Sequence, residues 1–128
     1  MIHELHISDR VHLSNYYISD DEVGTFFSAA DVCVLPYKGA TQSGIIAIAN
    51  HFDLPCIATN VGGLKENIRH GETGLIVKHL ASEFIAKTIE EYFGNELYTQ
   101  FSSAIKLQKE DNSWGKFADR MVEFSKTL

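Results

Sequence analysis

The chain has 128 residues, a formal net charge of −6, an apolar fraction of 45% and a charged fraction of 22%. This length fits one domain with its own core, and this composition is typical of a globular rather than a disordered chain. The negative charge, without a cluster of lysine and arginine, argues against nucleic acid as a partner. The first residues lack a signal-peptide pattern, and no apolar run has the length that crosses a bilayer.

The first part of the chain predicts a strand and then a helix. Residues 11–18 are rich in β-branched and aromatic types, which is typical of a strand. Ser19 and three acidic residues follow, and they indicate a helix start because acids favour the positive end of the helix dipole. Apolar residues at helical spacing continue this helix to Ala30. Before the strand, residues 2–5 look like the tail of another helix.

The middle of the chain alternates strands and helices. Residues 32–35 and 56–59 are short apolar runs, as in strands buried on both faces of a parallel sheet. An apolar helix is expected between them, over residues 44–52. After the second strand we expect, in order, a turn at 61–64, a helical piece at 65–69, a turn at 70–74 and a strand at 75–77.

The last third of the chain predicts three amphipathic helices. One runs from Phe84 to Tyr92 and ends near Gly94, and the second spans Leu97 to Ile105. Asn112 or Ser113 caps the third, whose apolar face carries Trp114, Phe117, Ala118 and Met121. The order of elements predicts an α/β fold with a parallel sheet and C-terminal helices.

The two cysteines, Cys33 and Cys56, each fall in a predicted buried strand. A free cysteine there behaves as a small apolar residue, and we favour free thiols over a disulfide. Two cysteines are too few for a zinc motif, and the histidines form no ligand pattern such as i, i+4 on one helix. We therefore expect no metal.

Ligands of an open parallel sheet bind outside the carboxyl ends of its strands. The loop at residues 37–44 leaves such an end and leads into a helix at Gly44. The first N–H groups of a helix have no internal partner and attract anions. With the hydroxyls of Thr41 and Ser43, they make a candidate cradle for a diphosphate. The alternative is that Ser43 only caps the helix and Gly44 only permits a tight turn.

Four motifs in order carry a resemblance to a known family. They are residues 30–37, Ser43 with Gly44, residues 54–66 and residues 71–77. Together they resemble the C-terminal, donor-binding domain of group 1 glycosyltransferases, which are retaining enzymes of the GT-B type. The resemblance implies a three-layer Rossmann-like parallel sheet, one half of a GT-B fold, with C-terminal helices. It also implies that residues 1–128 are a single nucleotide-sugar-binding domain, a piece of a larger two-domain glycosyltransferase.

The resemblance also implies roles for particular residues. The segment around Ile18 would contact the base, and Gly62 and Gly63 would shape a tight turn. Glu66 holds the family's acidic position, where ordering the turn is the alternative to touching the ligand. The implied donor-binding residues are Ile18, Thr41, Gln42, Ser43, Gly44, Ile45 and Glu66.

The chain departs from the family pattern in the charge of its donor loop. The family carries two glutamates around the helix that starts at this glycine, whereas no carboxylate occurs here between Lys38 and Phe52. Thr41 and Gln42 could only hydrogen-bond the sugar, and Asn50 is the nearest polar candidate for the ribose. The family's basic pair and its acceptor-side histidine have no counterpart in this chain. We therefore assign no catalytic residue and expect binding without turnover.

The function that the resemblance implies is transfer of a glycosyl unit, of the hexosyl type, from a nucleoside-diphosphate sugar to a glycan or lipid-linked acceptor, as in polysaccharide biosynthesis. The sugar donor would be substrate, and no cofactor is expected. The partner would be a missing N-terminal acceptor-binding domain. The full-length protein would lie in the cytoplasm, with peripheral association at the inner face of the membrane. The alternative is a non-catalytic α/β interaction module that forms a homodimer.

Overall fold

The computed structural model describes residues 1–39 and 44–128. Three of the expected site residues, Thr41, Gln42 and Ser43, lie outside the described residues. In chain order the elements are α1 (Asp20–Ala29), β1 (Cys33–Leu35), α2 (Gly44–His51), β2 (Cys56–Thr59), the short 3-10 helix η1 (Leu64–Glu66), β3 (Gly74–Val77), α3 (Ser82–Gly94), α4 (Tyr98–Asp111) and α5 (Trp114–Lys126).

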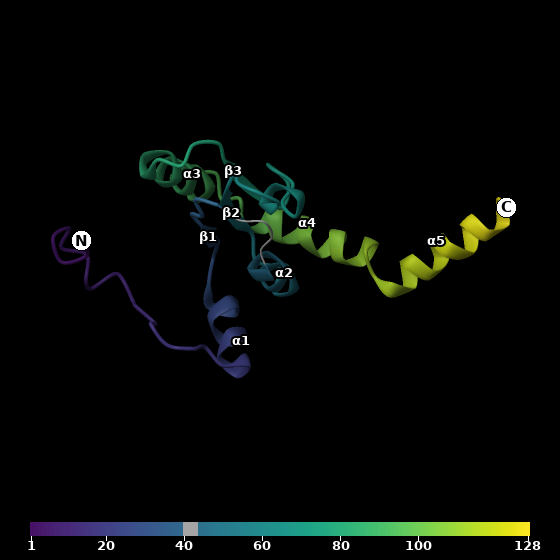
Figure 1. The fold of residues 1–128 in the computed structure, drawn as a ribbon, viewed down its shortest axis with the longest axis horizontal. Helices are drawn as coiled ribbons and strands as arrows, with labels where there is room; N and C mark the ends of the chain where they lie inside the picture. Colours follow the sequence, from purple (N-terminus) through teal and green to yellow (C-terminus); the bar gives the residue numbers. More distant parts are fainter. Residues whose placement is uncertain (40–43) are drawn as a thin grey trace.

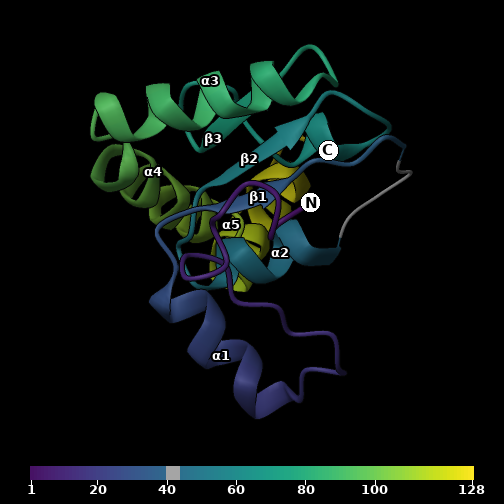
Figure 2. The same cartoon turned by 90° about the vertical axis from the view of Figure 1, so that its left-hand side faces the viewer.

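The strands form a parallel sheet in the order β1-β2-β3. Cys33 pairs with Cys56 in the first ladder, and Cys56 pairs with Gly74 in the second. Helix α2 lies on one side of the sheet, and α3 and α4 lie on the other (Figures 1 and 2). The expected α/β fold, with a parallel sheet between helical layers and helices at the C-terminal end, is confirmed.

Each face of the sheet has its own apolar core. On the α2 side, Leu35 and Cys56 pack with Ile46 from the helix. On the opposite side, Ile57 packs with Tyr92 of α3 and with Phe101 of α4. All four residues of β2 are buried, because this strand is central and helices cover both of its faces. The continuous apolar run that predicted β2 reflects this burial on two faces.

Helix α1 begins where the sequence predicts it. The Glu22 carboxylate accepts hydrogen bonds from both the backbone N–H and the hydroxyl of Ser19, each at 3.1 Å. The helix reaches the body through Phe27, whose ring stacks on Phe52 with centroids 5.9 Å apart. No residue of α1 is fully buried, so this helix packs only loosely beside the start of β1.

The prediction of a strand at residues 11–18 is wrong. This segment is extended, but it pairs with no strand of the described chain, and Leu13, Tyr16 and Tyr17 are exposed. Figure 1 shows it running away from the sheet towards the N-terminus. β-branched and aromatic residues favour a strand only where their side chains can pack on a half-buried sheet surface. Residues 2–5, expected as the tail of a helix, form only turns.

The three C-terminal helices follow the prediction, and Ser113 is the cap of α5. Its hydroxyl accepts a hydrogen bond from the Lys116 N–H at 3.3 Å. Helix α4 is tied to the end of α2 by Lys109, whose Nζ lies 2.6 Å from the Asp53 carboxylate. Within the described ranges, no helix combines the length and apolar character that crossing a membrane requires.

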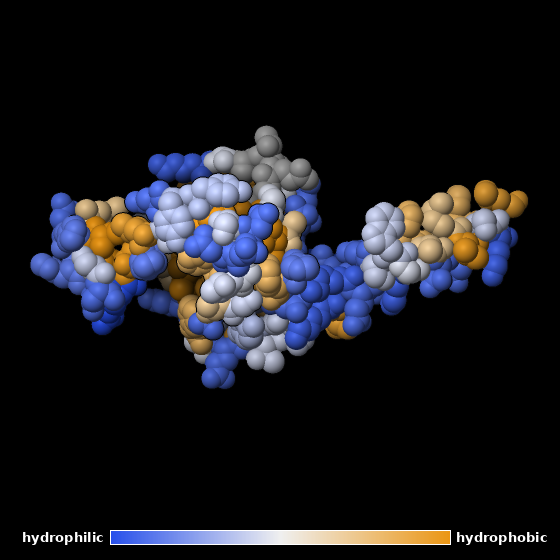
Figure 3. Space-filling view, turned by 90° about the horizontal axis from the view of Figure 1, so that it is seen from below, coloured by the Kyte–Doolittle hydropathy of each residue, from blue (hydrophilic) through white to orange (hydrophobic). Residues whose placement is uncertain are grey.

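Helix α5 projects from the rest of the molecule and buries none of its residues (Figure 1). The apolar face predicted for it is present. Figure 3 shows apolar side chains gathered along one side of this helix. Its large apolar side chains, all more than half exposed, are Trp114, Phe117, Met121, Val122 and Phe124. The described chain offers this face no packing partner.

Candidate functional site

The carboxyl ends of the three strands lie at one edge of the sheet, because the strands are parallel. Leu35, Thr59 and Val77 are the last residues of these strands. Figure 2 shows the beginning of α2 on the side of the molecule to which the strands point. The loop that joins β1 to α2 therefore leaves and re-enters at this edge, where ligands of open parallel sheets bind.

The beginning of α2 presents backbone donors that have no partner within the helix at this edge. Gly44 and Ile45 are its first two residues and both are exposed. Their N–H groups precede the first intrahelical hydrogen bond, and they lie at the positive end of the helix dipole. A Cβ added to Gly44 would meet nothing within 4 Å among the described residues. Among the described residues, none fills the space beside this backbone.

Thr59 links the two strands next to this opening. Its hydroxyl donates a hydrogen bond to the Tyr37 carbonyl oxygen at 2.6 Å, and the Leu35 carbonyl oxygen lies 3.5 Å away. Thr59 is 1% exposed, so this bond is shielded from water. This positioning role of Thr59 was not predicted from the sequence. The available signal was a threonine closing an otherwise apolar strand.

The turn after β2 has the geometry that its glycines predict. Gly62 has φ +52°, a left-handed conformation that suits glycine. Leu64 is fully buried and anchors η1, while the Glu66 N–H donates to the Gly63 carbonyl at 3.2 Å. The Glu66 side chain is exposed and makes no hydrogen bond or ion pair with the described residues. Its contact with a ligand stays a prediction.

A second hollow lies past the ends of β2 and β3. Its volume is about 290 Å³, and Asn60, Lys65 and Lys78 contribute polar side chains to its lining. The His70 ring is also there, where its Nδ1 accepts the Ile76 N–H at 2.9 Å. Sequence reasoning missed this pair of lysines because the two residues are far apart along the chain. Folding brings two positive charges to one hollow.

Two further candidate contacts come from other parts of the chain. Ile18 ends the extended segment 11–18, which hangs away from the sheet in both cartoon views (Figures 1 and 2). Asn50 lies near the far end of α2 and lines a hollow with Gln108 and Lys109 of α4. Asn50 is six positions after Gly44 in this helix, which is about 9 Å along the axis. The contact of Asn50 with the ribose and the contact of Ile18 with the base both stay predictions.

The described site residues include no catalytic constellation. Among them, no group of three or more histidine, cysteine, aspartate and glutamate side chains could hold a metal ion. Backbone N–H groups, lysines and one exposed carboxylate line the edge. Such groups bind and orient a charged ligand.

The family model for glycosyl transferases of group 1 matches residues 1–95. The chain belongs to the group 1 glycosyltransferase family. The fold expected from the resemblance, an α/β domain matching part of GT-B glycosyltransferases, is confirmed.

Curated relatives agree with this assignment. The chain is 30% identical over 108 residues to the D-inositol 3-phosphate glycosyltransferase of Pseudarthrobacter chlorophenolicus, covering 83% of this chain and 26% of the relative. It is 27% identical over 116 residues to the N-acetyl-alpha-D-glucosaminyl L-malate synthase of Bacillus anthracis, covering 80% of this chain and 30% of that enzyme.

Solved structures show the same fold. Sucrose-phosphate synthase from Thermosynechococcus elongatus matches 99% of this chain with a TM-score of 0.78 and 24% identity, over 32% of its own length. HepE of Anabaena, solved in complex with UDP, matches 99% of this chain with a TM-score of 0.75 and 18% identity, over 35% of its length. The chain thus spans about a quarter to a third of these relatives and structures.

Proposed function

We propose that residues 1–128 are the donor-binding domain of a retaining glycosyltransferase, which transfers a glycosyl unit from a nucleoside-diphosphate sugar to a glycan or lipid-linked acceptor. The observation that carries this proposal is the open start of α2 at the carboxyl edge of the sheet. Family membership supports it, since relatives bear the names of glycosyltransferases and one similar structure is a complex with UDP.

The chemistry of this edge suits a diphosphate. The N–H groups at Gly44 and Ile45, which have no partner within the helix, would face the phosphate oxygens, and the dipole of α2 would favour the negative charge of these oxygens. Thr41, Gln42 and Ser43 would add neutral hydrogen bonds to the phosphates and the sugar. Glu66 is exposed, and its carboxylate would accept a hydrogen bond from a hydroxyl group of the sugar. The site would hold and orient the donor and stabilise charge on the leaving phosphate.

The remaining steps belong to another part of the protein. The described edge carries no residue placed for acid–base chemistry, so an N-terminal acceptor-binding domain would complete the active site. Free thiols at Cys33 and Cys56 accord with the reducing cytoplasm. A position at the inner face of the membrane and a role in polysaccharide assembly rest on the family resemblance.

Isothermal titration calorimetry of the folded chain with UDP, GDP and ADP tests the binding claim. We expect one of the three to bind, without hydrolysis of the corresponding nucleotide sugar. A chain that is folded by circular dichroism and binds none of them would overturn the claim for this domain.

Gly44→Ala is the sharpest variant, because its Cβ would meet nothing within 4 Å and yet would stand where a phosphate approaches the backbone. We expect weaker nucleotide binding with unchanged thermal stability. Gly115→Ala is the matched control. Gly115 also lies in the first turn of a helix, α5, and its added Cβ also meets nothing within 4 Å. This control should bind nucleotide as the parent chain does.

The exposed apolar face of α5 favours a second candidate function, a non-catalytic module that binds protein through this helix. A homodimer of the chain is the simplest form of it. Size-exclusion chromatography with light scattering separates the two functions. A dimer whose mass does not respond to nucleotide, from a chain that binds no nucleotide, would favour the interaction module.

A further inference from the structure

Cys33 and Cys56 are direct neighbours in the sheet. Each is the first residue of its strand, and the two are partners in the register of β1 and β2. Register partners on adjacent parallel strands project to the same face, and both cysteines pack in the cluster under α2. The two thiols are therefore neighbours on one face of the sheet.

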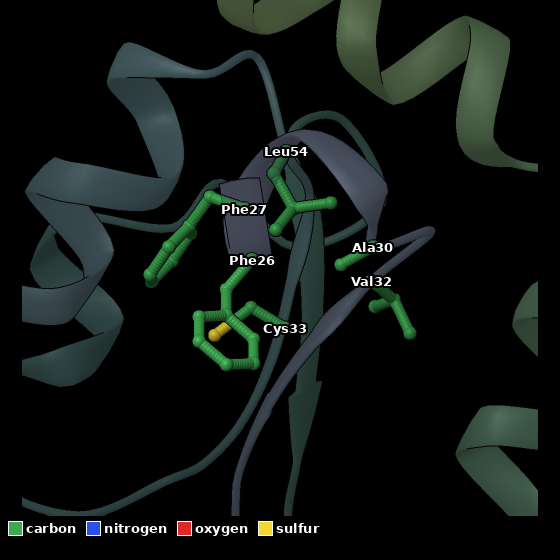
Figure 4. Close-up of a pocket in the computed structure, with 6 residues that line it drawn as sticks. All are labelled: Phe26, Phe27, Ala30, Val32, Cys33 and Leu54. Carbon is green, nitrogen blue, oxygen red and sulfur yellow. The ribbon is translucent and has the colours of Figure 1, made fainter. Parts of the chain in front are cut away.

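The two thiols differ in access. Cys56 is 2% exposed, whereas Cys33 is half-buried and lines an open pocket of about 170 Å³. Phe26 and Phe27 of α1 and Leu54 before β2 form other walls of this pocket. Figure 4 shows the side chain of Cys33 among the apolar groups that line this pocket. A small uncharged molecule can reach Cys33 from this side, whereas Cys56 does not line the pocket and is almost fully buried.

The proximity of these two residues also makes the two thiols chemically unequal. A hydrogen bond from Cys56 lowers the pKa of Cys33, against the opposing effect of burial. The same hydrogen bond, together with burial, raises the pKa of Cys56. Cys33, the more accessible of the two, is therefore the thiol that loses its proton more readily. The thiolate is the nucleophile in disulfide exchange.

We propose that Cys33 and Cys56 form a reversible dithiol site, in which Cys33 captures a small uncharged organic disulfide in the apolar pocket and Cys56 then closes an intramolecular disulfide. This site lies at the amino ends of the strands, opposite the donor edge, and does not depend on the proposed glycosyl transfer.

The two steps balance. The Cys33 thiolate attacks one sulfur of the disulfide RS–SR, a bond forms between Cys33 and RS, and RS⁻ leaves. Cys56 then loses its proton to solvent and attacks the Cys33 sulfur, which releases a second RS⁻. The protein loses two hydrogens and the organic disulfide is reduced to two thiols. Adjacent strands lie about 4.8 Å apart, within the Cα separation of about 4.4–6.8 Å that disulfides span, so the strands need not separate.

The probe is bis(2-hydroxyethyl) disulfide, an uncharged organic disulfide, added to the reduced, folded chain at neutral pH. Thiol trapping and intact mass spectrometry follow the products. We expect loss of both free thiols, a monomer lighter by two hydrogens, and a peptide map that links Cys33 to Cys56. Dithiothreitol should restore both thiols. Two persistent free thiols, a mixed disulfide that does not resolve, or a disulfide-linked dimer would overturn the proposal.

Two single variants test the order of events. In Cys56→Ala, Cys33 should stop as a stable mixed disulfide, because no resolving thiol is present. In Cys33→Ala, Cys56 should react at least tenfold more slowly than Cys33 does in the parent chain. Circular dichroism checks that each variant is folded, and the parent chain alone decides the proposal if one is not. Equal reactivity of the two cysteines in the folded single variants would contradict the assigned roles.

Discussion

The hydroxyl of Thr59, the last residue of β2, donates a hydrogen bond of 2.6 Å to the carbonyl oxygen of Tyr37, just beyond the end of β1. This bond joins the end of β2 to the start of the loop that leads from β1 to Gly44. Because Thr59 is buried, the bond lies in a medium where an unpaired carbonyl is costly. It therefore helps to hold the first part of the loop between β1 and α2 in place.

Replacing Thr59 with valine keeps the shape of the side chain and removes the donor. The Tyr37 carbonyl would then lose its partner, and we expect the free energy of unfolding to fall by about 1–3 kcal/mol. Urea denaturation measures this change. Thr88→Val is the matched control, since the Thr88 hydroxyl also donates to a carbonyl, that of Phe84 at 2.8 Å, but on the outside of α3. Equal losses in the two variants would contradict a special role for Thr59.

Gly74 sits where β3 comes closest to β2. A Cβ at this position would lie 2.3 Å from the carbonyl oxygen of Cys56 and 2.9 Å from Cγ2 of Ile68. The clash with backbone in the central ladder cannot be relieved by turning a side chain. We expect Gly74→Ala to reduce the free energy of unfolding by about 2–4 kcal/mol. Gly94→Ala, whose Cβ meets nothing within 4 Å, should be neutral or slightly stabilising. A neutral Gly74→Ala would show that the ladder shifts freely.

Tyr92 gives the fold a dependence on alkaline pH. Burial, assisted by nearby Tyr98 and Asp31, raises the pKa of Tyr92 from 10.0 to about 12, and its hydroxyl donates to the Asp31 carbonyl at 2.7 Å. The folded state thus keeps a proton that the unfolded state loses. This contribution to stability is fully present below about pH 10 and disappears as the pH rises towards about 12.

Denaturation across this pH range in the parent chain and in Tyr92→Phe tests the assignment. The variant should be less stable near neutral pH, because the Asp31 carbonyl loses its donor, and should show a shallower decline above about pH 10. Tyr17→Phe is the control, since Tyr17 is 87% exposed. An identical alkaline decline in Tyr92→Phe and the parent chain would assign the effect to other groups.

Removing residues 114–128 tests whether α5 belongs to the folding unit. None of the residues of α5 is buried, so the shortened chain should keep the cooperative unfolding and the thermal midpoint of the parent chain within a few degrees. Loss of cooperative unfolding would show that the helix does pack on the body. If the parent chain dimerises in solution through the apolar face, the shortened chain should be monomeric by light scattering.

The sequence predicts most elements of the fold, because burial on both faces leaves a clear local pattern. The expected strand at residues 56–59 coincides with β2, and the helix expected from Gly44 begins at Gly44. At the candidate site, Gly44 and the turn at Gly62 were predictable from glycine chemistry and from the four motifs. The hydrogen bond of Thr59 and the shared hollow of Lys65 and Lys78 were not, since each joins residues distant in sequence.

The amino-acid sequence by itself therefore determined the family, the order of strands and helices, and which faces of these elements are apolar. The tertiary structure decided which of those faces find partners. Residues 11–18 and helix α5 have patterns as good as those of β2 and α2, but the described chain offers them no neighbour. A local pattern records that a face gains free energy by burial, whereas burial itself requires a second surface that only the folded arrangement brings near. The same reason applies to Cys33 and Cys56, which become neighbours only in the register of two strands.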